Sequence, residues 1–286
     1  MNNKVNNFIN LGRFNKPLGA LLLAWPCTWG VMIANPEINS LIFYNTLFFF
    51  SAFIMRAAGC AWNDILDRNI DRMVERTKYR PIAAKTLSIT EGLLFIIICL
   101  VFGLFTLLFL PTKAIVICLI SIPFIILYPL TKRITFFPQF CLGITFNIGI
   151  LIGYTTISNE YFSLPSTLLY LGAICWTIAY DTIYAIQDYK DDKKNNIKST
   201  ATLMNKFSGK FAAIFYLFST ILFFFAIELA NFGNISKTTI LISGVWQFYY
   251  SYKINVNDHV NALKGFQIST LCGGILFVAM FLDIII

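Results

Sequence analysis

Long apolar stretches alternate with short polar segments along almost the whole chain. A helix needs about 20 predominantly apolar residues to cross the hydrocarbon core of a bilayer. Backbone groups inside a bilayer must find partners within their own segment, so each apolar stretch is expected to be helical. The pattern predicts an all-α bundle of about nine membrane-spanning helices, at residues 17–34, 41–62, 89–110, 113–130, 136–157, 164–186, 211–231, 237–252 and 265–285.

The basic residues between these stretches predict the orientation of the bundle. With nine spans, nearly all Lys and Arg residues fall in the N-terminal segment and in four loops on one side. Only Lys113 and Lys237 fall on the other side, and Arg56 lies within a span. Cytoplasmic loops carry an excess of Lys and Arg. The asymmetry therefore predicts a cytoplasmic N-terminus and a C-terminus on the opposite side.

The composition agrees with an integral membrane protein. Hydrophobic residues make up 57% of the 286 residues and charged residues only 13%, whereas soluble domains carry about 25% charged residues. The net charge of +8 does not indicate nucleic-acid binding, because the basic residues lie in short loops between apolar stretches, as membrane topology requires.

The ends of the chain and its cysteines fit a single membrane domain over residues 1–286. Residues 1–16 are polar and basic and show no cleavable signal pattern, so they are expected to form a cytoplasmic or interfacial lead-in to the first span. The seven cysteines lie in or beside apolar stretches, and none belongs to a CxxC pair. We interpret them as small hydrophobic residues, not as disulfides or metal ligands.

Two short stretches concentrate acidic residues at the ends of apolar segments. The stretch "CAWNDILDRNIDR", residues 60–72, ends the second predicted span, and "YDTIYAIQDYKDD", residues 180–192, ends the sixth. Together they hold seven of the 14 acidic residues, and both fall on the predicted cytoplasmic side. The polar positions of interest are Asn63, Asp64, Asp67 and Asp71 in the first stretch and Asp181, Tyr184, Asp188, Asp191 and Asp192 in the second.

Helical spacing predicts that each acidic stretch places its side chains on one helix face. Like charges at such spacings repel by a few tenths of a kcal/mol per pair, and carboxylates at membrane depth cost more, so an opposite charge is expected nearby. Mg²⁺ takes oxygen ligands and is commonly held by carboxylates together with substrate phosphates. The pattern thus predicts Mg²⁺ ions that bind a diphosphate between the stretches. The expected ligands are Asn63, Asp67, Asp71, Asp188 and Asp192.

Two other interpretations of the acidic stretches stay open at this point. They can be solvated helix ends whose charges are neutralised by neighbouring Arg and Lys residues. They can also form a cation-transport site, which predicts carboxylates in the middle of a span, whereas these lie at the cytoplasmic ends. The only histidine is His259, so no histidine cluster competes for a metal ion.

Basic and aromatic residues beside the acidic stretches are candidates for substrate contacts. Arg80 and Lys85, in the loop after the first stretch, suit the oxygens of a diphosphate. Arg133, in the next cytoplasmic loop, can pair with a carboxylate substrate through its planar guanidinium. Tyr180 and Tyr184 can face a cation that develops in the pocket. The basic residues can equally serve membrane topology alone.

At these residues the sequence resembles the intramembrane prenyltransferases of the UbiA superfamily. Their first motif, NDxxDxxxD, is matched in full by residues 63–71, and their second, DxxxD, by Asp188 and Asp192. The longer form "YDTIYAIQDYKDD" and the segments "FNKPLGALLLAWPCTWG" and "YPLTKRITFFPQFCLG" are similar to the subfamily that acts on 4-hydroxybenzoate. Asn15 stands where an Asp is common before Lys-Pro, a departure that affects no catalytic group.

The resemblance implies transfer of a polyprenyl group from polyprenyl diphosphate to 4-hydroxybenzoate, in ubiquinone biosynthesis, with Mg²⁺ as cofactor. The catalytic residues that it implies are Asn63, Asp64, Asp67, Asp71, Asp181, Asp188 and Asp192. The substrate-binding residues that it implies are Arg80, Lys85, Arg133, Tyr180, Tyr184 and Asp191. Alternatives are a related enzyme with another aromatic or tetrapyrrole acceptor and, in a different class, a cation transporter.

The same resemblance implies where the protein works. We expect a multi-pass protein of the bacterial inner membrane, or of the mitochondrial inner membrane in a eukaryote, with the active site on the cytoplasmic side. The expected partners are the two substrates and the lipid bilayer, with no nucleic acid and no obligate protein partner.

Overall fold

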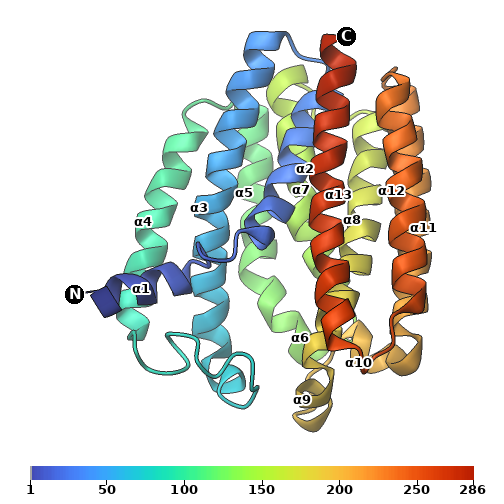
Figure 1. Ribbon diagram of the computed structural model, residues 1–286. Coiled ribbons are helices and arrows are strands. Elements are labelled where there is room, and N and C mark those ends of the chain that lie inside the picture. The colour runs from blue at the N-terminus through green and yellow to red at the C-terminus, as the bar shows by residue number, and fades with distance from the viewer. Residues whose placement is uncertain (1) are drawn as a thin grey trace.

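The computed structural model describes residues 2–286, with side chains from Lys4 onward, and all regular secondary structure in this range is helical (Figure 1). The long helices are α2 (Leu18–Ile33), α3 (Ile38–Asp71), α4 (Ile89–Leu107), α5 (Thr112–Leu127), α7 (Pro138–Ser158), α8 (Leu164–Ala185), α11 (Ser208–Leu229), α12 (Asn234–Lys253) and α13 (His259–Ile285). The short elements are α1 (Asn2–Leu11), η1 (Tyr128–Leu130), α6 (Thr131–Ile134), η2 (Ile186–Asp188), α9 (Tyr189–Lys194), α10 (Thr200–Met204) and η3 (Asn205–Phe207). The prediction of an all-α membrane bundle is confirmed.

Seven helical segments of the described chain are long and apolar enough to cross a membrane. The helices α2 and α12 are not among them: α2 has only 16 residues, and lysine, hydroxyl and tyrosine side chains make α12 less apolar. Both still pack within the bundle, α2 mainly against α7 and α3, and α12 against α11 and α13. The bundle therefore holds nine long helices within residues 2–286, and seven of them are long and apolar enough for a span, α5 with its 16 residues only together with η1 and α6.

Glycines let the central helices approach one another closely. A Cβ added to Gly30 of α2 would lie 2.2 Å from the carbonyl oxygen of Ile150, and one on Gly153 of α7 would lie 2.4 Å from that of Cys27. The α2 and α7 backbones are thus in direct contact, as is common between membrane helices. By contrast, α4 buries only two of its residues and lies at the edge of the bundle in Figure 1, as expected for a helix that faces lipid.

The segments that carry the acidic stretches gather at one end of the bundle, the lower end in Figure 1, which we call the acidic end. The α3 helix has 34 residues and is about 51 Å long at 1.5 Å per residue, well beyond a hydrocarbon core of about 30 Å. Its last turns therefore carry the first acidic stretch to this end. The predicted N-terminal lead-in contains α1, which lies across the bundle beside α4, and the C-terminus lies at the opposite end (Figure 1).

Candidate active site

The carboxylates of the first acidic stretch are buried at the acidic end of α3. Asp64, Asp67 and Asp71 expose only 1%, 0% and 4% of their surface. A buried charge destabilises a fold unless it is paired and hydrogen-bonded. The low exposure means that these three carboxylates are not solvated, so each needs a charged or hydrogen-bonding partner within the protein.

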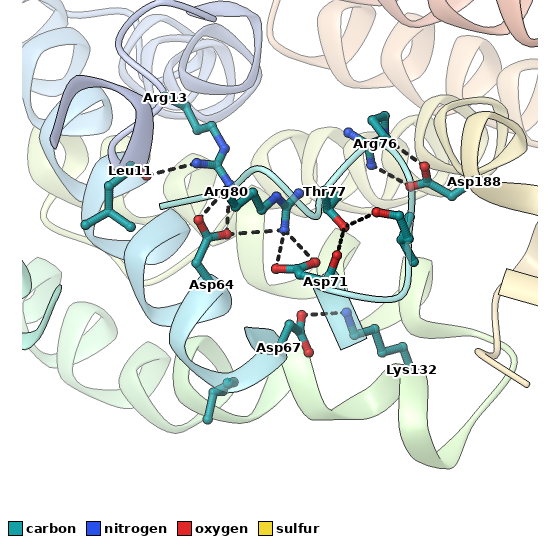
Figure 2. Close-up of polar contacts among 12 residues, drawn as sticks. Leu11, Arg13, Asp64, Asp67, Asp71, Arg76, Thr77, Arg80, Lys132 and Asp188 are labelled. Carbon is teal, nitrogen blue, oxygen red and sulfur yellow. Dashed lines mark hydrogen bonds and ion pairs between the residues drawn. The ribbon is translucent and has the colours of Figure 1, made fainter. Parts of the chain in front are cut away.

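Two of these carboxylates are joined by arginines from other segments (Figure 2). Nη2 of Arg13 donates to both oxygens of Asp64, at 2.7 and 2.8 Å. Nη1 of Arg80 lies 3.2 Å from Asp64 and donates to both oxygens of Asp71, at 3.1 and 3.0 Å. One chain of ion pairs therefore connects the N-terminal segment, the end of α3 and the α3–α4 loop.

The third carboxylate, Asp67, pairs with the short helix α6. Nζ of Lys132 donates to Oδ2 of Asp67 (Figure 2). Nη2 of Arg133 lies 3.5 Å from Oδ1 of Asp67 and donates to the carbonyl oxygen of Leu66 at 2.8 Å. The Arg133 side chain is still 45% exposed, so it lies beside the first acidic stretch and remains accessible to a substrate.

The second acidic stretch does not form one continuous α-helix. The α8 helix ends at Ala185, the 3-10 turn η2 follows, and α9 begins at Tyr189. The continuous α-helix that the spacing of Asp181 to Asp192 predicts is therefore interrupted at this point, because a 3-10 turn has 3.0 residues per turn instead of 3.6. Tyr184 and Asp188, on either side of the break, still share Arg76 as a partner.

The α3–α4 loop connects the two acidic stretches. Nε and Nη2 of Arg76 donate to the two oxygens of Asp188, at 2.7 and 2.5 Å (Figure 2). Nη1 of Arg76 donates to the hydroxyl of Tyr184 at 2.8 Å, and the backbone N–H of Glu75 donates to Asp191 at 3.0 Å. The Arg76–Asp188 pair spans 112 positions of the sequence, so the two stretches meet in one polar site, as the sequence predicts.

The ion pairs strengthen the positive charge of both loop arginines. Burial lowers the pKa of the Arg76 guanidinium, but its hydrogen bonds and electrostatic attraction to Asp188 and Tyr184 together outweigh burial and hold the pKa above its ordinary value. Burial also lowers the pKa of Arg80, but the charges of Asp64 and Asp71 outweigh it and raise the pKa above its ordinary value. Both arginines therefore carry a permanent charge in this site.

Aromatic rings line α8 between the second acidic stretch and the core of the bundle. The ring of Tyr184 lies 4.5 Å from that of Phe266, and the buried Tyr180 packs edge-on against Trp176 at 5.0 Å. Asp181 lies on α8 between these two tyrosines and is partly buried. The predicted cation-facing residues are thus next to the acidic residues of α8.

One predicted substrate residue lies apart from the acidic cluster. Lys85 lines a surface hollow with Arg68, Arg72 and Glu91 on the outer side of the α3–α4 loop. The structure does not bring its side chain together with the carboxylates of either acidic stretch, so its assignment to diphosphate remains a prediction without geometric support.

The chemistry of the donor atoms suits a hard divalent cation. The predicted ligands offer only oxygen atoms for binding a metal, as Mg²⁺ prefers. Oδ1 of Asn63 is buried without a hydrogen-bond partner, which is rare for a buried polar atom. Within residues 2–286, no three Asp, Glu, His or Cys side chains converge in a metal-binding group, because the carboxylates face their basic partners. Metal binding at these residues therefore requires the ion pairs to exchange partners.

Three basic residues of the site are not distinguished by the local sequence: Arg13, Arg76 and Lys132. Each lies in a polar segment where membrane topology already accounts for positive charge. Their partners are 51 to 112 positions away, so only the folded chain shows that they belong to the site.

Arg56 is a fourth basic residue of interest, because an ionisable residue inside a span is a signal of function. Its Nε is buried without a hydrogen-bond partner, and its Nη1 donates to Sγ of Cys60 at 2.8 Å. Its guanidinium lies over the ring of Phe146, 5.5 Å from the ring centre. A Cβ added at Gly19 would lie 3.1 Å from this guanidinium. The glycine therefore makes room for the Arg56 side chain.

A helical membrane bundle that brings two Asp-rich stretches into one buried polar site is typical of intramembrane prenyltransferases. The model of the UbiA prenyltransferase family matches residues 23–282, and the chain belongs to this family. The resemblance noted from the two motifs is thereby confirmed.

Known relatives are similar over much of the chain. The 4-hydroxybenzoate octaprenyltransferase of Vesicomyosocius okutanii subsp. Calyptogena okutanii (strain HA) is 33% identical over 280 residues, which cover 95% of this chain and 99% of that protein. The mitochondrial 4-hydroxybenzoate polyprenyltransferase of Arabidopsis thaliana is 43% identical over 199 residues, which cover 69% of this chain and 49% of that protein. The chain thus matches about half the length of the plant relative.

A solved structure shares the fold. The UbiA homolog from Archaeoglobus fulgidus bound to GPP and Mg²⁺ has a TM-score of 0.71 to this chain at 17% sequence identity, with 96% of this chain and 99% of that chain covered. This likeness shows that the arrangement of the helices is that of a UbiA homolog.

Proposed function

We propose that the protein transfers a polyprenyl group from a polyprenyl diphosphate to the ring carbon ortho to the hydroxyl of 4-hydroxybenzoate, with release of diphosphate, in ubiquinone biosynthesis. The observation that carries this proposal is the meeting of a buried and a partly buried acidic stretch in one polar site of a membrane bundle. Membership of the UbiA prenyltransferase family and the names of the two relatives support the reaction and the acceptor.

We assign diphosphate binding to the acidic cluster and the basic side chains around it. The proposed metal ligands are Asn63, Asp67, Asp71, Asp188 and Asp192. Bound Mg²⁺ would supply a Lewis acid and a template for the departing diphosphate. Arg76, Arg80 and Lys132 neutralise the carboxylates in this structure. They are placed to move onto diphosphate oxygens, with which Arg and Lys form short, charge-assisted hydrogen bonds.

The aromatic rings of α8 are assigned to the prenyl group. When the C–O bond breaks, its electron pair leaves with diphosphate and an allylic cation remains. Tyr180 and Tyr184 lie beside the acidic stretch, where their rings can stabilise this cation. The ortho ring carbon of the acceptor then forms the new bond, and the ring loses its proton. The apolar interior of the bundle excludes water, which would otherwise capture the cation.

Two arginines are candidates for the carboxylate of the acceptor. Arg133 lies beside Asp67, and its exposed side chain is accessible to a water-soluble acceptor. Arg56 is a second candidate, because its buried Nε has no partner whereas Arg133 already donates to Leu66. A carboxylate bound at either guanidinium would be recognised by a two-pronged ion pair.

We also propose that residues 1–286 form one membrane domain with its active site on the cytoplasmic side. The basic loops that surround the acidic end support this orientation. Cation transport is disfavoured, because the paired carboxylates lie at one end of the bundle and not in the middle of a span.

The decisive experiment is an assay of the purified protein in lipid vesicles with a polyprenyl diphosphate, 4-hydroxybenzoate and Mg²⁺. The expected product is 3-polyprenyl-4-hydroxybenzoate, and its formation should stop when EDTA removes the metal. Prenylation of another aromatic or tetrapyrrole acceptor, with none of 4-hydroxybenzoate, would reassign the acceptor. Metal flux across the vesicles without prenyl transfer would overturn the enzyme assignment.

A further inference from the structure

The N-terminal segment reaches the active site from the outer side of the bundle. The ring of Phe8 on α1 stacks on that of Phe95 on α4, with centres 5.9 Å apart, and Lys4 pairs with Glu91 at 2.6 Å. Leu11 at the end of α1 is fully buried. The contacts of Phe8 and Leu11 attach α1 to the bundle and direct the residues after it toward the end of α3, whereas the Lys4–Glu91 pair is exposed and such pairs contribute little.

Arg13 has a backbone conformation that disfavours arginine. Its φ is 57°, in the left-handed region that costs a residue with a side chain about 1–2 kcal/mol. The N–H of Phe14 donates to the carbonyl of Ile9 at 3.1 Å and closes the end of α1, a helix ending in which glycine usually takes the left-handed position. Strained backbone of this kind persists where surrounding contacts hold it, often at functional sites.

The side chain of Arg13 supplies such contacts. Besides its two hydrogen bonds to Asp64, its Nη1 donates to the carbonyl oxygens of Asn10 and Leu11, at 2.5 and 3.3 Å. Asp64 is 1% exposed and is flanked by Arg80 on its other side. Both Asp64 oxygens are thus taken by Arg13, whereas the neighbouring Asn63 has an amide oxygen without a partner.

We infer that Arg13 is a positioning residue that fastens the N-terminal segment to the active site through Asp64. In this role Asp64 is an anchor, and it leaves Asn63, Asp67 and Asp71 to act on the diphosphate. Arg80 bridges Asp64 and Asp71, so loss of the anchor displaces the carboxylates that follow it on α3. The effect on the reaction rests on the proposed function, whereas the fastening of the segment does not.

Hydrogen exchange of the purified protein in detergent, without substrates, tests the fastening. Arg13→Gly removes the ion pair and the hydrogen bonds of Nη1 to the end of α1, but it places the favoured residue at the left-handed position, which offsets the weakening of the turn. Backbone amides of residues 5–14 should exchange at least tenfold faster in this variant. Lys4→Gln removes an exposed ion pair from the same helix and should change exchange less than threefold. Wild-type exchange in Arg13→Gly would overturn the inference.

A double-variant comparison tests whether Asp64 is the partner that matters. Asp64→Asn should speed exchange of the same amides about as much as Arg13→Gly, and the combined variant should exchange no faster than the faster single variant. Independent, multiplying effects would overturn the pairing, because residues that act through one shared contact do not add.

Kinetics then test positioning. Arg13→Gly should raise the KM for polyprenyl diphosphate at least tenfold and leave the KM for the acceptor within twofold, and Arg13→Lys should recover part of the loss. Faster exchange with unchanged kinetics would overturn the positioning role. A wild-type protein without prenyl transfer would refute the proposed function, and the exchange experiment would still decide whether the segment is fastened.

Discussion

Asp64, Asp67 and Asp188 each pair with a basic side chain from a distant part of the chain, whereas Asp71 pairs with Arg80, nine positions away. Asp67 has no exposed surface and pairs with Lys132, 65 positions away, and Asp188 pairs with Arg76. Removal of one partner from such a pair leaves an uncompensated charge, which costs more than the pair contributes. Substitutions of these paired residues should therefore be tested both for substrate binding and for the stability of the fold.

The carboxylates of the two stretches should act as one unit. Asp67→Asn and Asp188→Asn each keep the side-chain size and remove the charge, and each should weaken Mg²⁺-dependent diphosphate binding roughly 10- to 150-fold, as expected for a charged hydrogen-bonding group. The double variant should be little worse than the more damaging single variant, because groups that act together fail together. Glu160→Gln, exposed at the other end of the bundle, is the control. Strictly multiplicative losses, or full activity in EDTA, would count against a shared metal site.

Steady-state kinetics should separate the two candidate acceptor arginines. If Arg133 binds the carboxylate, Arg133→Ala should raise the acceptor KM roughly 10- to 150-fold, because a charged hydrogen bond contributes about 1.5–3 kcal/mol, with little change in the KM for the diphosphate. If Arg56 binds it, Arg56→Lys should produce this pattern instead, since lysine keeps the charge but not the planar two-pronged contact. An equal rise in both KM values for Arg133→Ala would indicate a role in structure or topology.

At the scale of whole helices, the bundle depends on close backbone contact between α2 and α7. The added Cβ atoms at Gly30 and Gly153 would meet backbone atoms and not flexible side chains. Neither helix can yield locally, so a larger residue has to push the helices apart.

Gly30→Ala should therefore lower the stability of the detergent-purified protein by about 1–3 kcal/mol, the usual cost of overpacking. Gly59→Ala on α3 is a matched control, because a Cβ there meets nothing within 4 Å. The control should raise stability by up to about 1 kcal/mol through helix propensity. Thermal unfolding followed by intrinsic fluorescence measures both changes, and equal effects of the two substitutions would show that the close contact does not matter.

The helices could be predicted from the sequence because hydropathy and length are local properties. The span predicted at 136–157, for example, is the helix Pro138–Ser158. The break at η2 could not be predicted, since Ile186–Asp188 contains no glycine or proline to signal it. The partners of Arg13 and Arg76 were equally inaccessible, because ion pairs over 51 and 112 positions depend on how the helices pack.

For the whole molecule, the distribution of basic residues predicts the orientation in the membrane. The α8 helix separates residue 160 from residue 195, and the basic loops lie around the acidic end.

Reporter fusions at residues 160 and 195 should therefore report opposite sides of the membrane, with residue 195 in the cytoplasm. A fusion at the C-terminus, residue 286, should report the same side as residue 160, because it lies at the end of the bundle opposite the acidic site (Figure 1). Labelling of residues 160 and 195 from the same side would refute the nine-helix topology.

The length of α3 ties its catalytic end to its apolar part. Because the 34 residues form one helix, the carboxylates stand at a constant height above the segment that spans the lipid. A mismatch between that segment and the bilayer costs a fraction of a kcal/mol per Å and is relieved by tilting or by local thinning. Lipids with longer acyl chains would draw the carboxylates toward the headgroups and shorter ones would lift them into water, so acyl-chain length should tune the access of a diphosphate to its metal site.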